Sequence, residues 1–184
     1  MLELSLNILD VAQNSIKAQS TLIELDVEIN SEQDRLVVLI NDDGFGMSSE
    51  QLEKVTDPFF TTRDTRSVGL GVPFFKDAAE STGGEFKIES APGKGTSVRA
   101  VFGLSHIDRV PLGDMNATVE MLVFFNTGID FVYRYRVDDE EFALDTREIK
   151  ELLEGAPIDS PEVKIFISEF LKENTTEINK GRIF

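Results

Sequence analysis

The sequence predicts an α+β fold, a two-layer α/β sandwich in which helices cover one face of a mixed β-sheet. Within the first 104 residues, apolar residues recur at helical spacing in two long segments and follow strand patterns in four short ones. The helical segments are residues 2–18 and 69–82, and the strand segments are residues 21–30, 36–40, 85–90 and 96–102. This order of elements favours a sheet covered by helices on one side.

Composition and charge limit the classes of function. The chain has 184 residues, of which 41% are hydrophobic, no cysteine, and a net charge of −16 at pH 7. The absence of cysteine excludes disulfides and thiolate chemistry. The acidic balance argues against nucleic acid or an anionic membrane as a partner, because phosphate groups favour Lys and Arg. The chain has neither a run of eighteen apolar residues nor a basic N-terminal leader, so we expect a cytoplasmic protein.

The first predicted helix, residues 2–18, carries one apolar and one polar stripe. The apolar residues that we expect to face the core are Leu2, Leu6, Leu9 and Ile16. The polar stripe, at steps of three, four and three residues, consists of Asn7, Asp10, Asn14 and Lys17. A solvated helix face is the ordinary interpretation. The alternative is a metal and phosphate site, because an amide oxygen suits Mg²⁺, a carboxylate accepts a proton and a lysine reaches phosphate.

The strands at residues 21–30 and 36–40 form a predicted hairpin that leads into a glycine-rich corner at residues 41–47. This corner contains Asp-x-Gly-x-Gly. Gly44 and Gly46 allow a positive φ and have no Cβ, so the backbone could approach a flat ligand closely. Asp42 could accept a hydrogen bond from an exocyclic amine. Because ordinary turns use the same residue types, the motif alone leaves both interpretations open.

A short helix, a loop and a longer helix follow the corner. Ser48 is a predicted N-cap, and Gln51 completes a capping box. Residues 61–68 are polar and without periodicity, so we expect a mobile loop. Gly69-Leu70-Gly71 then opens a helix whose N-terminus could bind phosphate or could simply begin the helix. The inward residues of this helix are predicted to be Phe74, Phe75, Ala78 and Ala79.

The chain divides into an N-terminal domain of residues 1–104, a linker of residues 105–115 and an α+β extension of residues 116–184. Pro111 and Gly113 mark the linker. The extension shows no constellation of chemically active residues, and its role is not predicted.

Within the extension we expect a hairpin and two helices. The hairpin strands are residues 118–125 and 129–137. Asp145 caps the first helix, and Ser160-Pro161 starts the second. The inner stripe of the second helix is predicted to be Val163, Phe166, Ile167, Phe170 and Leu171.

Taken together, the first 104 residues resemble the Bergerat-fold ATPases. This superfamily includes DNA gyrase, a heat-shock chaperone, mismatch-repair ATPases, histidine kinases and anti-sigma-factor serine kinases. Five short motifs occur in the order of the family, and the resemblance is closest to the kinase branch. The five motifs are Asp10–Lys17, Asp42–Met47, Pro58–Arg63, Gly69–Gly71 and Gly95–Thr96.

The resemblance implies a site for ATP and Mg²⁺. Asn14 would hold Mg²⁺ through its amide oxygen, and Asp42 would receive the adenine amine with Thr96 nearby. Asp10 would be the catalytic carboxylate. The loop from Thr61 to Gly71 would form a lid over the triphosphate. The nucleotide-binding residues implied in this way are Asn14, Lys17, Asp42, Gly44, Gly46, Met47, Phe60, Thr61, Thr62, Gly69, Leu70, Gly71 and Thr96.

Three departures from the family pattern affect the expected activity. Asp10 stands where the ATPase branches carry Glu, and because Asp is one methylene shorter it would act as a weaker base or through a water. The sequence begins at the first motif, so the helical hairpin that bears the phosphoacceptor histidine is not expected, and neither is autophosphorylation of the usual kind. The extension does not resemble the transducer domain of gyrase-type enzymes.

We therefore expect a regulatory protein kinase that binds Mg-ATP and passes the γ-phosphoryl group to a partner protein. A weak ATPase, or a nucleotide-gated module whose extension docks a partner, is the alternative. A relic that binds nothing is a third possibility, against which the intact Asn14, Asp42 and glycine set argues. The sequence predicts no oligomeric state.

Overall fold

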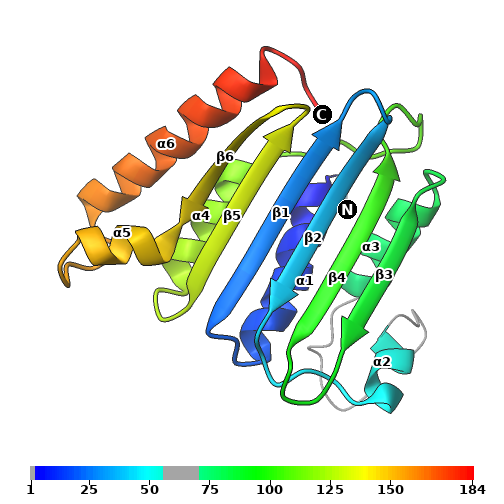
Figure 1. The fold of residues 1–184 in the computed structure, drawn as a ribbon, viewed down its shortest axis with the longest axis horizontal. Coiled ribbons are helices and arrows are strands. Elements are labelled where there is room, and N and C mark those ends of the chain that lie inside the picture. The colour runs from blue at the N-terminus through cyan, green and yellow to red at the C-terminus, as the bar shows by residue number, and fades with distance from the viewer. Residues whose placement is uncertain (1–2, 56–70) are drawn as a thin grey trace.

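The structure is a computed structural model that describes residues 3–55 and 71–184. In this part of the chain, helices cover one face of a six-stranded β-sheet (Figure 1). The helices are α1 (Leu4–Lys17), α2 (Ser49–Val55), α3 (Gly71–Glu80), α4 (Met115–Phe125), α5 (Thr146–Leu152) and α6 (Pro161–Asn179). The strands are β1 (Leu22–Asn30), β2 (Arg35–Asp42), β3 (Glu85–Ser90), β4 (Thr96–Gly103), β5 (Asp130–Val137) and β6 (Glu140–Asp145).

The strands lie in the order β3-β4-β2-β1-β5-β6. β1 and β5 are parallel, and the other neighbouring pairs are antiparallel. In Figure 1, α1, α3 and α4 lie behind the sheet, and α6 runs beside β6. The predicted mixed sheet with helices on one face is confirmed.

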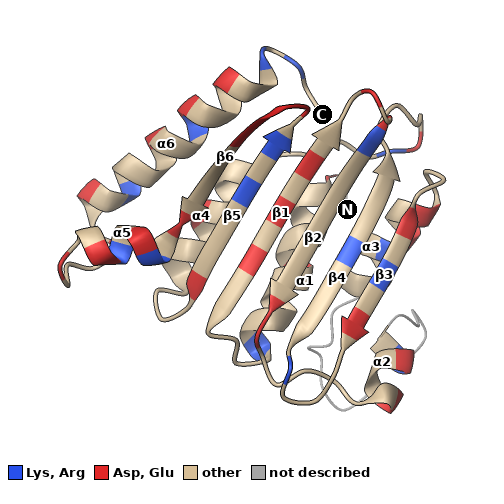
Figure 2. Ribbon diagram, viewed as in Figure 1, with Lys and Arg blue, Asp and Glu red and all other residues tan. Residues whose placement is uncertain are grey.

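The core lies between the sheet and the helices. β1 alternates as predicted, because Ile23, Leu25, Val27 and Ile29 are buried and the residues between them are only partly covered. The predicted hairpin of β1 and β2 is also confirmed, with Leu25 opposite Ile40. The charged residues of β1, whose positions Figure 2 marks, alternate with the buried ones and therefore lie on the other face of the sheet.

The predicted core stripe of α1 was only partly correct. Leu9 and Ile16 pack against the core but are partly buried, and Leu2 lies outside the described residues. The buried apolar residues are Leu4, Ile8, Val11 and Ala12, whereas Leu6 is 44% exposed. The helix carries leucines and isoleucines at two overlapping helical spacings, so periodicity alone could not decide between them. Only the position of the sheet determines which stripe is buried.

Two phenylalanines that were predicted to face inward are exposed. Phe74 in α3 and Phe166 in α6 are 46% and 57% exposed, whereas the following residues, Phe75 and Ile167, are fully buried. Adjacent positions on a helix point about 100° apart, so each pair could bury only one member well.

The segment predicted as the strand of residues 118–125 forms the helix α4. The Asp114 side chain accepts a hydrogen bond of 2.9 Å from the Ala117 N–H and caps its N-terminus. The buried residues recur at helical spacing: Met115, Thr118, Val119, Leu122 and Val123. β4 and β5 run in the same direction at different places in the sheet, and such a connection needs a crossover, which α4 supplies.

The strands of the extension continue the sheet of the N-terminal domain. β5 pairs with β1 and with β6, a strand that the sequence did not predict. Asp145 caps α5 as predicted, with its side chain accepting from the Arg147 N–H. The division at residues 105–115 stays a prediction. Among the described residues, no helix combines the length and the apolar character that crossing a membrane requires.

Candidate functional site

A cavity of about 300 Å³ lies between α1, α2, the start of α3 and the ends of β2, β3 and β4. Six of the predicted site residues line it: Asn14, Lys17, Asp42, Gly46, Met47 and Thr96. A larger cavity of about 440 Å³ lies near the C-terminal residues and contains none of them. We therefore take the smaller cavity as the candidate site.

Asp42 is held in a fixed orientation at the end of β2. Ser15 Oγ donates a hydrogen bond of 2.6 Å to Oδ2, and the Gly44 and Thr96 N–H groups donate bonds of 2.9 Å and 3.2 Å to Oδ1. A carboxylate offers about four lone-pair sites. Three donors therefore leave room for one more, which a ligand amine inside the cavity could supply.

The walls of the cavity around Asp42 are largely apolar. The residues that form them, besides Met47, are Val11, Ala18, Phe45, Val55, Val72, Ile88 and Val98. A single anchored carboxylate among apolar walls suits a flat heteroaromatic ring, because the ring faces stay dry while one edge is hydrogen-bonded. The sequence did not mark these residues as walls of a site, because most of them are ordinary apolar residues of helices and strands.

Gly46 and Gly95 are required by the backbone near the cavity. Gly46 has a φ of +67°, and a Cβ there would overlap the Ala91 carbonyl oxygen. Gly95 has a φ of +78°, and a Cβ there would overlap the Asp42 carbonyl oxygen. The close approach of the loop after β2 to the turn between β3 and β4 depends on both glycines.

Gly44 serves a different contact from the one predicted. It does not line the cavity, and a Cβ at this position would lie 2.7 Å from the Ala18 carbonyl oxygen and from Ser20 Oγ. The next residue, Phe45, donates its N–H to the Ala18 carbonyl at 3.0 Å. Gly44 therefore lets the loop after β2 pack on the end of α1.

Ser90 joins the two loops that border the cavity. Its hydroxyl accepts from the Met47 N–H at 2.9 Å, donates to the Gly95 carbonyl at 2.8 Å and lies 2.9 Å from Thr96 Oγ1. Sequence reasoning missed both Ser90 and Ser15. Ser15 directly follows Asn14, which was a weak signal, whereas nothing around Ser90 distinguishes it from any serine at the end of a strand.

The polar stripe of α1 runs from the cavity toward the N-terminus of α3. Lys17 is exposed and Asn14 is half-buried. Asp10 does not line the cavity, but its Cβ would lie 2.8 Å from a Cβ added at Gly71, the first residue of α3. Asp10 therefore lies against a helix N-terminus, where backbone N–H groups and the helix dipole favour negative charge.

Asn7, at the far end of the stripe, is 4% exposed, and its Oδ1 has no hydrogen-bond partner among the residues that the structure describes. A buried amide oxygen without a partner is costly, so Asn7 is unusual among the core residues. The predicted residues Phe60, Thr61, Thr62, Gly69 and Leu70 lie outside the described part of the chain.

Asn14 could contribute one oxygen to a Mg²⁺ ion. Among residues 3–55 and 71–184, no three His, Cys, Asp or Glu residues are grouped so that they could hold a metal ion. Mg²⁺ commonly keeps several waters and binds phosphate oxygens, so one protein oxygen fits an ion that arrives with a nucleotide.

The neighbouring Asp43 has a structural role. Burial raises the pKa of its carboxyl, but hydrogen bonds from the Thr21 side chain and from the Leu22 and Thr21 N–H groups outweigh this, so the pKa is lowered. Asp43 ties the corner after β2 to the start of β1, beside the site.

Comparisons with known proteins agree with this geometry. Residues 2–106 match the family model of the "Histidine kinase-, DNA gyrase B-, and HSP90-like ATPase". The sensor histidine kinase YxdK of Bacillus subtilis is 31% identical over 97 residues, which cover 50% of this chain and 30% of the kinase. The sensor histidine kinase ZraS of Salmonella typhimurium is 34% identical over 89 residues, which cover 48% of this chain and 19% of the kinase.

The chain thus spans less than a third of the length of these two relatives. Among solved structures, the N-terminal domain of a DNA repair protein aligns with a TM-score of 0.53 at 11% identity, covering 79% of this chain and 53% of that one. At this identity the likeness concerns the fold alone.

Proposed function

Since the chain belongs to the family of histidine kinase-, DNA gyrase B- and HSP90-like ATPases, we propose that it binds ATP with Mg²⁺ in the cavity beside Asp42 and transfers the γ-phosphoryl group to a partner protein. The observation that carries the proposal is the anchored carboxylate of Asp42. Its three donors come from α1, from the loop after β2 and from β4, and they leave one acceptor position facing an apolar cavity.

On the adenine side, Asp42 would accept a hydrogen bond from the exocyclic amine. Ser15 and Thr96 would hold the carboxylate in place while the ring lies between the apolar walls. A guanine carries a carbonyl oxygen where adenine carries its amine, and that oxygen would face the carboxylate oxygen without a proton between them. The site would therefore favour adenine.

On the phosphate side, the polar stripe of α1 would supply three functions in order. Lys17 at the cavity edge would attract phosphate, and the Asn14 amide oxygen would bind Mg²⁺. Mg²⁺ would neutralise phosphate charge. Asp10, beside the N-terminus of α3, would accept a proton from the attacking hydroxyl group.

A second candidate function is slow ATP hydrolysis, or nucleotide-gated binding of a partner without transfer. The observation that favours it is the short side chain of Asp10, which lies against Gly71 and outside the cavity. In hydrolysis, a water would be the phosphoryl acceptor. In nucleotide-gated binding, the strands and helices that continue the sheet beyond β1 would bind the partner in response to the nucleotide.

Calorimetric titration with Mg-ATP tests the binding step. We expect binding to wild-type protein and a large loss in Asn14→Ala and in Asp42→Asn. Asn41→Ala is the matched control, because Asn41 adjoins Asp42 but does not line this cavity. Equal heats for wild type and both site variants would contradict the proposal.

Incubation with labelled ATP separates the two candidate functions. Transfer predicts a labelled protein whose labelling is lost with Asn14→Ala. Release of labelled phosphate without any labelled protein favours hydrolysis.

A further inference from the structure

The face of the sheet opposite the helices is open. Figure 2 marks charged positions along β1, β3, β4 and β5, and in Figure 1 none of the described helices crosses this face. A groove of about 370 Å³ on this face is lined by residues of β4, β2, β1, β5 and β6. Val37 and Leu39 are among its lining residues, and Asp26 and Arg99 lie on either side of them.

The strand register places opposite charges symmetrically about β2. Leu39 pairs with Asp26 of β1 on one side and with Arg99 of β4 on the other. Two residues along β2, Val37 lies in the next row of paired residues on this face, between Glu28 of β1 and Val101 of β4. β2 is therefore an apolar line with an acidic strand on one side and an arginine on the other.

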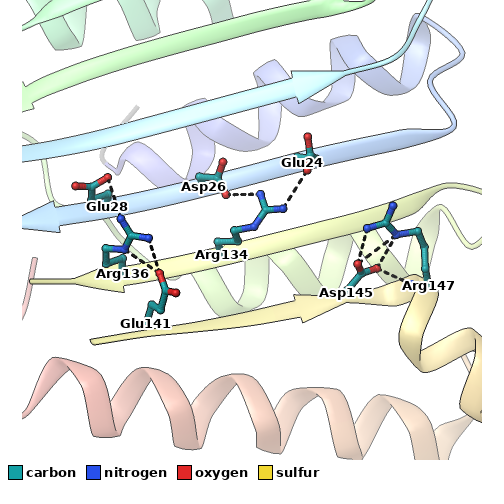
Figure 3. A network of polar contacts seen from close by, with 8 residues as sticks. All are labelled: Glu24, Asp26, Glu28, Arg134, Arg136, Glu141, Asp145 and Arg147. Atoms are coloured by element: carbon teal, nitrogen blue, oxygen red, sulfur yellow. Dashed lines mark hydrogen bonds and ion pairs between the residues drawn. The ribbon is translucent and has the colours of Figure 1, made fainter. Parts of the chain in front are cut away.

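The acidic strand is held rigidly by the strand beyond it (Figure 3). Arg134 of β5 donates to Glu24 at 3.1 Å and to Asp26 Oδ1 at 2.9 Å, and Arg136 donates to Glu141. This leaves Asp26 Oδ2 as a preoriented acceptor. In the part of the chain that the structure describes, Arg99 is half-buried and forms no ion pair, so its charge is available for an outside partner.

We propose that this open face is a docking surface for a second copy of the chain, packed face to face about a twofold axis parallel to β2. Rotation about that axis places β1 of one copy over β4 of the other. Asp26 of each copy then faces Arg99 of the other, and Val37 and Leu39 meet their own equivalents across the axis. The face is complementary to itself, which is the requirement for such an isologous interface.

The outer strands are compatible with this arrangement. Glu85 of β3 shares a row with Arg136 of β5, so the rotation brings these opposite charges together. Lys87 of one copy comes over Arg134 of the other, but both cations already have carboxylate partners, Glu89 for Lys87 and Glu24 and Asp26 for Arg134. Arg35 lies at the end of β2, at the rim, where it can turn into solvent.

The area of the face fits a weak dimer. A twofold axis along β2 leaves β6 without a counterpart, so five strands contribute. At about 4.8 Å apart, each about eight residues long with a rise of about 3.3 Å per residue, they give a face of roughly 600 Å² per copy. This is below the roughly 800 Å² per partner of standard stable interfaces, and much of the face is polar. We therefore expect a reversible dimer that forms at micromolar or higher concentration.

Sedimentation velocity of the full chain tests the proposal. At about 0.15 M salt the Debye length is about 8 Å, which screens the repulsion between two copies of charge −16. Wild type should convert from monomer to dimer as concentration rises. Arg99→Glu places two carboxylates opposite each other at both symmetric contacts and should raise the dimer dissociation constant at least about tenfold.

Arg99→Ala removes the cation without adding a carboxylate, so it should weaken the dimer less than Arg99→Glu. Lys172→Glu on α6 is the matched control, because it changes the net charge equally but lies on an exposed helix position. Leu39→Asp gives an independent disruption at the axis, and thermal melts identify any variant that fails to fold. A wild type that stays monomeric, or a dimer that persists in folded Arg99→Glu and Leu39→Asp, overturns the proposal.

Discussion

Ser15 Oγ donates a hydrogen bond of 2.6 Å to Oδ2 of Asp42. This contact joins α1 to the end of β2 and directly connects the residue after Asn14 with the carboxylate proposed to bind adenine. The proposed metal side and the proposed base side of the site are thus linked through this hydrogen bond. A change in either is expected to move the other.

The first prediction concerns this hydrogen bond. Ser15→Ala should leave the fold intact and lower the affinity for Mg-ATP about tenfold, because Asp42 keeps only two of its three donors and can rotate. Isothermal calorimetry measures the change. Ser81→Ala, whose exposed hydroxyl donates only to the Ala78 carbonyl, is the control and should bind like wild type. Unchanged affinity in Ser15→Ala would show that Asp42 does not need this donor.

The second prediction compares two glycines with nearly the same backbone. Gly46 and Gly93 have φ values of +67° and +72°, but only a Cβ at Gly46 meets a neighbour, the Ala91 carbonyl. Gly93→Ala should cost about 1–2 kcal/mol of unfolding free energy for the left-handed conformation alone. Gly46→Ala should cost clearly more and should also weaken nucleotide binding. Equal destabilisation of the two variants in urea would contradict the predicted overlap.

A third prediction concerns the buried amide of Asn7, whose Oδ1 has no hydrogen-bond partner in residues 3–55 and 71–184. Asn7→Leu replaces it with an apolar side chain of similar size, so the free energy of unfolding should rise by about 1 kcal/mol or more. Asn116→Leu on α4 is the control, because Asn116 Oδ1 accepts a hydrogen bond of 3.0 Å from Thr175. The control should not be stabilised. A loss of stability in Asn7→Leu would indicate that the Asn7 amide has a favourable partner.

Much of the fold could be predicted because its signals are local. The alternation of β1 and the capping box of α2 depend on residues a few positions apart, and both are present: Ser48 and Gln51 exchange two hydrogen bonds. The helix α4 was mistaken for a strand because Met121–Phe125 is a short apolar run that fits either structure. Only the need to cross over from β4 to β5 decides it.

The site divides in the same way. Asn14, Asp42 and Thr96 could be predicted from motifs, and the structure brings all three to one cavity. Ser15 and Ser90 could not, because their roles come from hydrogen bonds that span 27 and 43 positions. The residues around a serine do not indicate which distant residue its hydroxyl will bind.

The fourth prediction concerns pH. Hydrogen bonds from Arg182, the Ser31 N–H and the Ser31 hydroxyl lower the pKa of Asp138 from 3.8 to about 2. In the unfolded chain this carboxyl titrates at its ordinary value, so its contribution to stability is present above pH 3.8 and is lost as the pH falls through about 2. In Asp138→Asn, the free energy of unfolding should therefore decrease less steeply than in wild type as the pH falls from 3.8 to about 2. The neighbouring Asp139→Asn, on an exposed side chain, is the control for the loss of one charge.

The last prediction separates nucleotide binding from chemistry. Asp10 lies beside Gly71 and outside the cavity, so Asp10→Asn keeps the size of the side chain and should leave Mg-ATP affinity nearly unchanged. It removes the proposed proton acceptor, and the rate of phosphoryl transfer or hydrolysis should fall about 100-fold or more. Asp77→Asn, an exposed position on α3, should change neither quantity. If Asp10→Asn retains the wild-type rate, the carboxylate is not the base. If instead it loses binding, Asp10 helps to shape the phosphate side of the site.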